Sequence, residues 1–191
     1  MKNNNMKEHI LQKGIVLVSE KGFKNTGISE ILKSASVPKG SFYYYFNSKT
    51  DFGIQLINYA GQSFFTTIEN HFHNDTPPLE RIENFFGEQI NHFQGSPCRC
   101  NCLFGKLTQE LTDEDPLFRR ELAKIFESWK VLFRDTLLEA QDSGSIKLNH
   151  SPEALATFIL SGWEGALIQG KLLQSIRPLE EFRDIFFSLL R

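Results

Sequence analysis

The stretch from Ile28 to Thr50, ISEILKSASVPKGSFYYYFNSKT, most constrains what this chain can fold into. Apolar residues recur three, four and seven positions after Ile28, which is the spacing of one helix face, and Thr26 is placed to cap that helix. Pro38 can start a second helix, because a first-turn residue needs no amide hydrogen. Phe42 and Phe46 share a face of this second helix and are expected to pack on the first. Two short helices joined by a tight turn indicate a helix-turn-helix.

The outer side of the second helix carries groups that suit DNA. Gly40 allows close backbone approach, lysines supply charge, and hydroxyl groups can bind phosphate or base edges. The aromatic run could instead be core, but three adjacent tyrosines cannot all point inward from one short helix, and Tyr45 could go either way. We expect the DNA-binding residues to be Thr26, Lys39, Gly40, Ser41, Tyr43, Tyr44 and Lys49.

The charge is distributed unevenly along the chain. The net charge is −2, but residues 1–50 hold eight Lys against three acids, and residues 51–191 hold thirteen Lys or Arg against twenty acids. A basic head on an acidic body is typical of a DNA-binding module joined to a different module. The head contains no Arg, which argues against bidentate reading of guanine.

Composition also bounds the compartment and excludes a membrane span. The polar start, MKNNNMKEH, has no apolar stretch behind it and does not resemble a signal peptide. No apolar run reaches the length of a transmembrane helix. Three Cys residues, an odd number, suggest thiols in a reducing compartment rather than a disulfide framework. We therefore expect a cytoplasmic protein.

The rest of the chain has helical periodicity throughout. A first helix is expected over 7–21, and Ser48 and Asp51 form a capping box for a long linking helix over 48–72. Further helices are expected over 78–94, 102–112, 116–142, 152–174 and 178–190. The predicted fold is all-α, with about nine helices. Its predicted domains are a DNA-binding domain over 1–50 and a regulatory, sensing and dimerisation domain over 51–191.

The last two predicted helices carry a possible dimer contact. Small residues keep one helix face slim at Gly162, Gly165, Ala166 and Gly170, and the final helix has an apolar stripe at Phe182, Ile185, Phe186, Leu189 and Leu190. The residues alone fit a contact between two copies and an ordinary core equally well.

All three cysteines lie within the stretch SPCRCNCLFGKL, residues 96–107. Cys102 is expected near a helix N-terminus, where the helix dipole, Arg99 and Lys106 would favour the reactive thiolate. An inert buried thiol is the plainer alternative. A metal site is a third, but Cys-x-Cys-x-Cys lacks a fourth ligand, for which only His92 is a candidate, so no metal or other cofactor is expected.

The head resembles the TetR family of transcriptional repressors. The pattern G-F-x-x-T-x-I-x-x-I, followed by V-P-K-G-S-F-Y-x-Y-F-x-S-K, covers residues 22–49 of this chain. The resemblance implies a TetR-like helical fold, binding to a palindromic double-stranded operator, and a homodimer formed by the last two helices. Two recognition helices about 34–36 Å apart read such a palindrome.

Within that family the body resembles the electrophile-sensing, NemR-like branch. The resemblance rests on Cys102-Leu103-x-x-Lys106-Leu107 and on residues 167–171, Leu-Ile-Gln-Gly-Lys. It implies that Cys102 senses the inducer and that Lys171 is its partner. Because this chain adds Cys98 and Cys100, disulfide exchange could replace or follow the lysine step.

The sequence therefore predicts a repressor that thiol-reactive electrophiles or oxidants release from DNA. The alternative is a TetR-like repressor with a reversible apolar ligand, whose pocket would be lined by Phe85, Phe86, Phe93, Trp129, Phe133 and Trp163. An enzyme is not expected, because the chain has no phosphate-binding glycine loop, no nucleophile motif and no C-x-x-C, which weakens the case for a thiol oxidoreductase.

Overall fold

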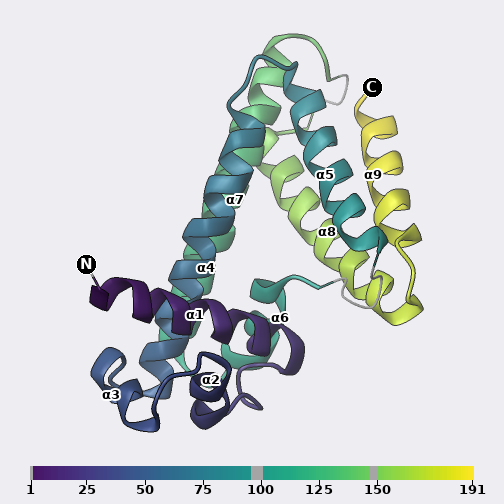
Figure 1. Cartoon of the computed structure of the whole chain (residues 1–191). Helices are drawn as coiled ribbons and strands as arrows, with labels where there is room; N and C mark the ends of the chain where they lie inside the picture. The colour runs from purple at the N-terminus through teal and green to yellow at the C-terminus, as the bar shows by residue number, and fades with distance from the viewer. Residues whose placement is uncertain (1, 96–100, 147–149) are drawn as a thin grey trace. The chain divides into compact units, whose positions relative to one another are not determined.

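A computed structural model describes residues 2–95, 101–146 and 150–191, without the side chains of residues 2–4 and 39. These parts of the chain form nine α-helices and one 3₁₀ turn (Figure 1), which confirms the predicted all-α fold. No helix in the described ranges is long and apolar enough to cross a membrane. The elements are α1 (Lys2–Lys21), α2 (Ile28–Ser34), η1 (Lys39–Ser41), α3 (Phe42–Tyr45), α4 (Lys49–Phe72), α5 (Pro78–Gln94), α6 (Leu103–Leu111), α7 (Pro116–Asp142), α8 (Pro152–Leu173) and α9 (Arg177–Leu190).

The chain packs as two compact units. Residues 1–64 and 103–125 form one, called here the head unit, and residues 65–102 and 126–191 form the other, the body unit. Helices α4 and α7 each begin in the head unit and continue into the body unit. Packing therefore groups α6 with the DNA-binding helices, which the sequence did not suggest. The predicted functional boundary at residue 50 stays a prediction.

Three phenylalanines form the centre of the head unit. Phe42 and Phe46 are buried, as their spacing predicted, and their ring centroids are 5.2 Å apart. Both rings pack on Phe52 of α4, at 5.8 and 5.1 Å between centroids. Burying an aromatic ring of this size contributes about 1.5–3 kcal/mol, so this contact fixes α3 against α4.

The helix-turn-helix differs from the sequence prediction in two local features. Thr26 does not cap α2: it is fully buried, its Oγ1 donates to Gly22 O at 2.7 Å, and the N-cap position belongs to Gly27. Gly22 ends α1 with a φ of +88°, a conformation that glycine adopts without strain. The second helix is not continuous from Pro38, because the chain first makes the 3₁₀ turn η1 and only then the single α-turn α3.

Ser48 caps α4 as predicted, but the reciprocal bond of the capping box goes to the amide of Asn47 and not to that of Ser48. The amide of Asp51 donates to Ser48 Oγ at 3.0 Å, and the Asp51 carboxylate accepts from the amide of Asn47 at 2.7 Å. Partial burial alone would raise the pKa of Asp51. Hydrogen bonds from Gln55 and Asn47, with the charge of Lys7, outweigh burial and hold the pKa below its usual value.

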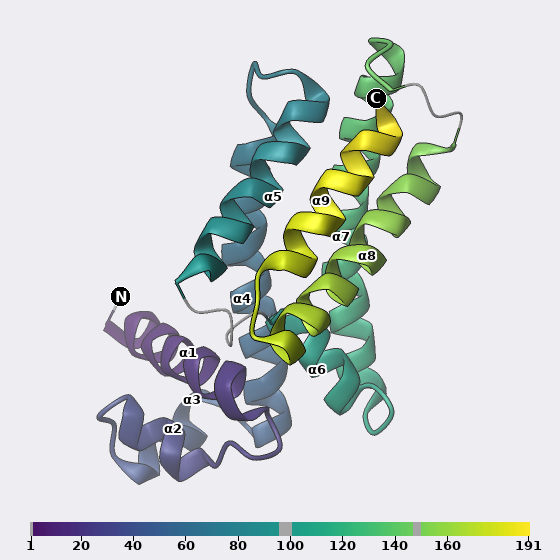
Figure 2. The same cartoon turned by 90° about the vertical axis from the view of Figure 1, so that its right-hand side faces the viewer.

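In the body unit α8 and α9 lie side by side (Figure 2). A Cβ at Gly162 would lie 2.3 Å from Phe182 Cε2, so this part of the slim face packs against α9 of the same chain. The apolar stripe of α9 divides: Phe186 and Leu190 are buried, with Phe187 beside them, whereas Ile185 and Leu189 are 59% and 56% exposed. The slim face is thus partly core, and a second apolar face remains outside.

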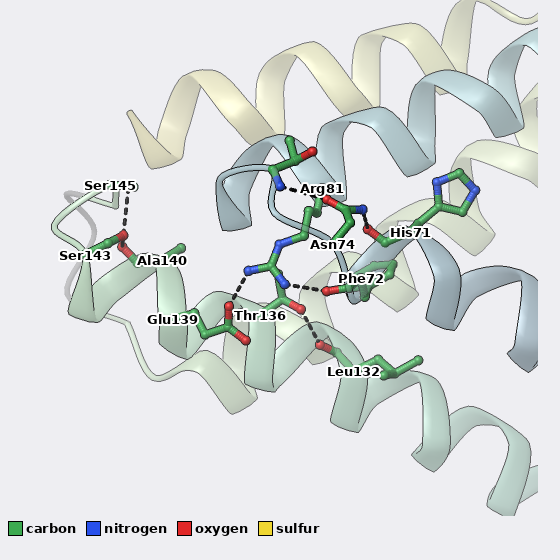
Figure 3. A network of polar contacts seen from close by, with 11 residues as sticks. His71, Phe72, Asn74, Arg81, Leu132, Thr136, Glu139, Ala140, Ser143 and Ser145 are labelled. Atoms are coloured by element: carbon green, nitrogen blue, oxygen red, sulfur yellow. Dashed lines mark hydrogen bonds and ion pairs between the residues drawn. The ribbon is translucent and has the colours of Figure 1, made fainter.

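A buried arginine joins three helices of the body unit (Figure 3). Arg81 of α5 donates from Nη1 to the carbonyl of Phe72, the last residue of α4, and from Nη2 to Glu139 of α7. Because Phe72 O has no partner within its own helix, Arg81 satisfies an orphan carbonyl while it pairs with a carboxylate. This network fixes the far end of α4 within the body unit.

Candidate DNA-binding surface and thiol site

The second helix of the helix-turn-helix presents two tyrosines to solvent. Tyr43 and Tyr44 are 69% and 67% exposed, and Tyr45 is half-buried. Gly40 is exposed and no heavy atom lies within 4 Å of where its Cβ would be, so its backbone is open to a close approach. Ser41 is half-buried, and the side chain of Lys39 lies outside the described structure. This arrangement can supply hydroxyl donors and backbone contacts to a phosphate chain.

Lys49 and Thr26 have partners inside the head unit. Lys49 Nζ donates to Lys24 O at 3.1 Å and lies 5.0 Å from the centroid of the Phe23 ring, so the side chain is half-buried against the α1–α2 turn. The buried Thr26 braces the same turn. Thr26 is fully buried and does not reach the surface as expected, whereas the DNA contact of Lys49 stays a prediction.

Helix α6 holds the end of α1 and the turn that follows it. Lys106 Nζ donates to Ser19 O at 2.8 Å and to Glu20 O at 3.1 Å. One turn later, the carboxylate of Glu110 accepts hydrogen bonds from the backbone amides of Phe23 and Lys24. A cation at the last carbonyls of a helix and a carboxylate on free amides are both favourable. The orientation of the helix-turn-helix therefore depends on α6.

Cys102 immediately precedes α6, within one residue of the predicted helix start. It is half-buried and forms no disulfide with any described residue. Its side chain packs on an apolar cluster of the body unit, called here the sensor cluster: Ile90, Phe93, Ala166, Leu167 and Leu179, with Trp163, Ile176 and Phe182 at its edge. The chain passes from the body unit to the head unit between Cys102 and Leu103.

A carboxyl group, missed at the sequence level, is hydrogen-bonded to Cys102. Glu164 of α8 is half-buried, and burial raises the pKa of its carboxyl while the hydrogen bond from Cys102 opposes that shift. Lys106 donates its ammonium hydrogens to two carbonyls of α1, and its expected effect on the thiol stays a prediction. An acidic residue in the otherwise apolar stretch Gly162–Leu167 was the available signal for Glu164.

Of the other predicted partners of Cys102, the structure describes Lys171 but not the two neighbouring cysteines. Lys171 lies in the last turn of α8 and is exposed. Cys98, Arg99 and Cys100 lie outside the described residues, so their pairing with Cys102 stays a prediction. His92 is exposed beside Phe93, and the described residues contain no group of three potential His, Cys, Asp or Glu metal ligands.

Phe85, Phe86, Phe133 and Trp163, four of the aromatic residues predicted to line an apolar pocket, are connected by ring contacts. Phe86 stacks on Phe133 at 5.9 Å between centroids and lies 4.7 Å from the Trp163 ring. Phe93 and Trp163 also belong to the sensor cluster, and Trp129 is buried in the same unit. The two sites that the sequence offered as alternatives therefore adjoin.

Comparisons with known proteins agree with the fold and with the helix-turn-helix. Residues 10–53 match the family model for bacterial regulatory proteins of the tetR family, and residues 78–186 match the tetracyclin repressor-like C-terminal domain. The transcriptional repressor DhaR of a Mycobacterium species is 32% identical over 97% of this chain and 92% of its own length. The regulator AcuR of Cereibacter sphaeroides is 35% identical over 94% of this chain and 82% of its own.

Among solved structures, the reduced form of Escherichia coli NemR superposes with a TM-score of 0.87, at 27% identity over 98% of both chains. DhaR and AcuR share more of their sequence with this chain than NemR does, so a place in the NemR-like branch is not established by identity. The helix-turn-helix, the all-helical body and the two family matches show that the chain belongs to the TetR family of DNA-binding transcriptional repressors.

Proposed function

We propose that this protein represses transcription from a palindromic operator and leaves DNA when an electrophile or oxidant reacts with Cys102. The observation that carries the proposal is the position of the thiol. Cys102 is directly followed by α6, whose Lys106 and Glu110 bind the backbone around the end of α1. A change in the size or bonding of the sulfur alters the start of α6 and, through these hydrogen bonds, the helix-turn-helix.

The proposed oxidation of Cys102 can be reversed, so the protein can be used repeatedly as a sensor. A peroxide oxidises the thiol of Cys102 to a sulfenic acid and is itself reduced to water. The amine of Lys171 then displaces water to form a sulfur–nitrogen bond, or a thiol of Cys98 or Cys100 does so to form a disulfide. A cellular thiol restores the reduced protein from either product. The related structure of NemR is described as a reduced form, which is consistent with a redox-active member of the family.

The exposed apolar face of α8 and α9 is proposed as the homodimer contact. Its members are Phe158, Ile168, Leu172, Leu173, Ile185 and Leu189, each between 54% and 73% exposed. Gly165 lies on α8 with no atom within 4 Å of where a Cβ would be, so a second helix can approach closely there. A dimer sets two recognition helices at a fixed separation, and a change in that separation prevents both from binding their half-sites.

The test uses operator DNA selected from a random duplex library by binding to the reduced protein. Binding is followed by fluorescence anisotropy before and after hydrogen peroxide, with mass spectrometry of the same samples. Cys102→Ser should bind DNA as the wild type does and should no longer release it on oxidation. Cys98→Ser and Cys100→Ser should retain release. Normal release by Cys102→Ser would contradict the proposal.

A second candidate function, induction by a reversible apolar ligand, is favoured by the position of Phe93 and Trp163 in the sensor cluster. An apolar inducer bound among these rings would lie beside Cys102 without bonding to it. Saturable release of DNA from Cys102→Ser by such a compound, reversed on dilution, would identify this mode. The two modes are compatible, since the same rings can bind an apolar electrophile before it reacts.

A further inference from the structure

Glu164 and Cys102 form a pair of ionisable groups on an apolar surface. They are joined by a hydrogen bond, although Cys102 ends the segment before α6 and Glu164 lies in the middle of α8. The sulfur packs on the sensor cluster, whose core members are all apolar. A carboxylate that accepts from a thiol stabilises the S–H form, and its negative charge disfavours the thiolate.

We propose that Glu164 accepts the proton of Cys102 when the sulfur reacts, and so sets which reagents the sensor responds to. This inference rests on the proposed role of Cys102. At rest the thiol is held protonated by the neighbouring carboxylate, which protects it from weak electrophiles. When a strong electrophile arrives, the proton moves to Glu164 as the new bond to sulfur forms.

The proton and electron balance is complete with a peroxide as the oxidant. The sulfur attacks one peroxide oxygen, the O–O bond breaks, and the thiol proton passes to the Glu164 carboxylate. The departing hydroxide takes up that proton and leaves as water, so Glu164 returns to its ionised form. With an alkylating agent such as iodoacetamide, sulfur displaces iodide and the proton reaches solvent through Glu164.

The surroundings make Glu164 suitable for this role. Burial raises the pKa of its carboxyl, which improves it as a proton acceptor near neutral pH, and the hydrogen bond to Cys102 acts in the other direction. Charged groups on the adjoining helices include the ion pairs His71–Glu88, Arg177–Glu181 and Arg183–Asp184. His92 and Lys171 are exposed, and Glu180 is half-buried.

The two groups titrate as a coupled pair, and the pH dependence follows from that coupling. At pH values where the carboxyl has lost its proton and the thiol has kept its own, the carboxylate can act as the base. The reaction rate should therefore show a plateau, that is, not change with pH in this range. Above the second ionisation the thiolate reacts directly and the rate rises again. A thiol without a base would lose a factor of about ten in rate for each pH unit below its own ionisation.

The experiment measures the alkylation rate of Cys102 by iodoacetamide from pH 5 to 10. Cys98→Ser and Cys100→Ser are combined so that Cys102 is the reacting thiol. Glu164→Gln keeps a hydrogen-bond acceptor but cannot take a proton. This substitution should remove the plateau and slow alkylation at pH 6 by about tenfold or more. At pH 9.5 the variant should react as fast as the parent or faster, because it lacks the carboxylate that repels the thiolate.

Glu153→Gln is the matched control, because it makes the same substitution on an exposed carboxylate of α8 that pairs with Lys130. Its pH profile should match that of the parent. Parallel profiles for Glu164→Gln and the parent would overturn the proposal. A single thiol ionisation without a plateau in the parent would also overturn it, and this measurement needs no Glu164 variant to fold.

Failure of this inference is distinguishable from failure of the proposed function. If Cys102→Ser abolishes DNA release but Glu164→Gln leaves the alkylation profile unchanged, the sensor stands and the role of Glu164 is refuted. If Glu164→Gln changes the profile as expected but Cys102→Ser still releases DNA on oxidation, Glu164 controls a thiol that is not the sensor.

Discussion

Lys106 of α6 donates to the carbonyl oxygen of Ser19 at 2.8 Å and thereby binds the last turn of α1. This lysine follows Cys102, the proposed sensor, by four positions. The sequence suggested α4 as the link between the two modules because that helix leaves the DNA-binding head. The hydrogen bonds of Lys106 and Glu110 connect α6, which follows Cys102 in the chain, to the same head, so we propose α6 as a second route.

Lys106→Met should weaken this route without changing the chemistry at Cys102. The substitution keeps most of the aliphatic stem and removes a charge that interacts with two terminal carbonyls, so the head unit should lose about 1 kcal/mol of stability. Peroxide should still oxidise Cys102, but the resulting fall in DNA affinity should be at least about threefold smaller than in the wild type. Lys124→Met, an exposed lysine of α7 paired with Glu121, is the control and should behave as the wild type. Full DNA release by Lys106→Met would exclude α6 as the route.

Replacement of groups on the recognition surface should weaken DNA binding and leave the fold intact. Tyr43→Phe removes an exposed hydroxyl and Lys39→Ala removes a charge, and each should reduce operator affinity as measured by anisotropy. For Lys39→Ala the salt dependence of binding should become shallower by about one unit of slope. Phe42→Ala should instead lower the free energy of unfolding by about 3–5 kcal/mol, because it removes a buried ring. If Tyr43→Phe and Lys39→Ala both bind DNA normally, this surface is not the one that reads the operator.

Charge placed on the outer face of α8 and α9 should separate the proposed dimer. Leu172 is 73% exposed and Ile185 is 59% exposed, so glutamate at either position is tolerated in a monomer and buried in a dimer. Light scattering should show monomers, and binding to the palindrome should fall to the level of a single half-site. Leu117→Glu, on an exposed apolar residue of α7, should remain dimeric. Oxidised wild-type protein should also remain dimeric, since release is attributed to half-site spacing and not to dissociation.

The Asp51 carboxylate should contribute stability that acid removes. Its pKa is lowered in the folded protein from an ordinary value of 3.8, so its contribution is present above that value and is lost as pH falls through the folded pKa. Asp51→Asn should reduce the free energy of unfolding by about 1 kcal/mol at pH 7, and the difference should shrink towards zero near pH 2. Urea titrations at the two pH values measure this. Asp113→Asn, which replaces an exposed aspartate, is the control for the substitution itself and should change the free energy of unfolding at pH 7 little.

The sequence alone determined the local features of this protein. The spacing of Phe42 and Phe46 predicted their burial, Ser48 and Asp51 predicted the cap of α4, and the break at Ser96–Asn101 predicted the start of α6 beside Cys102. These features depend on neighbours within one or two helical turns, where period and side-chain chemistry are sufficient. The resemblance carried by residues 22–49 was specific enough to give the family, which the two family matches confirmed.

Tertiary structure decided which distant groups meet. The pattern of small residues could not show that Gly162 packs on Phe182 of the same chain. Nothing near Cys102 in the chain shows that its thiol donates to the carboxyl of Glu164, which a different helix supplies. Periodicity assigns a residue to a helix face, but the group opposite that face is set by how the helices pack against each other.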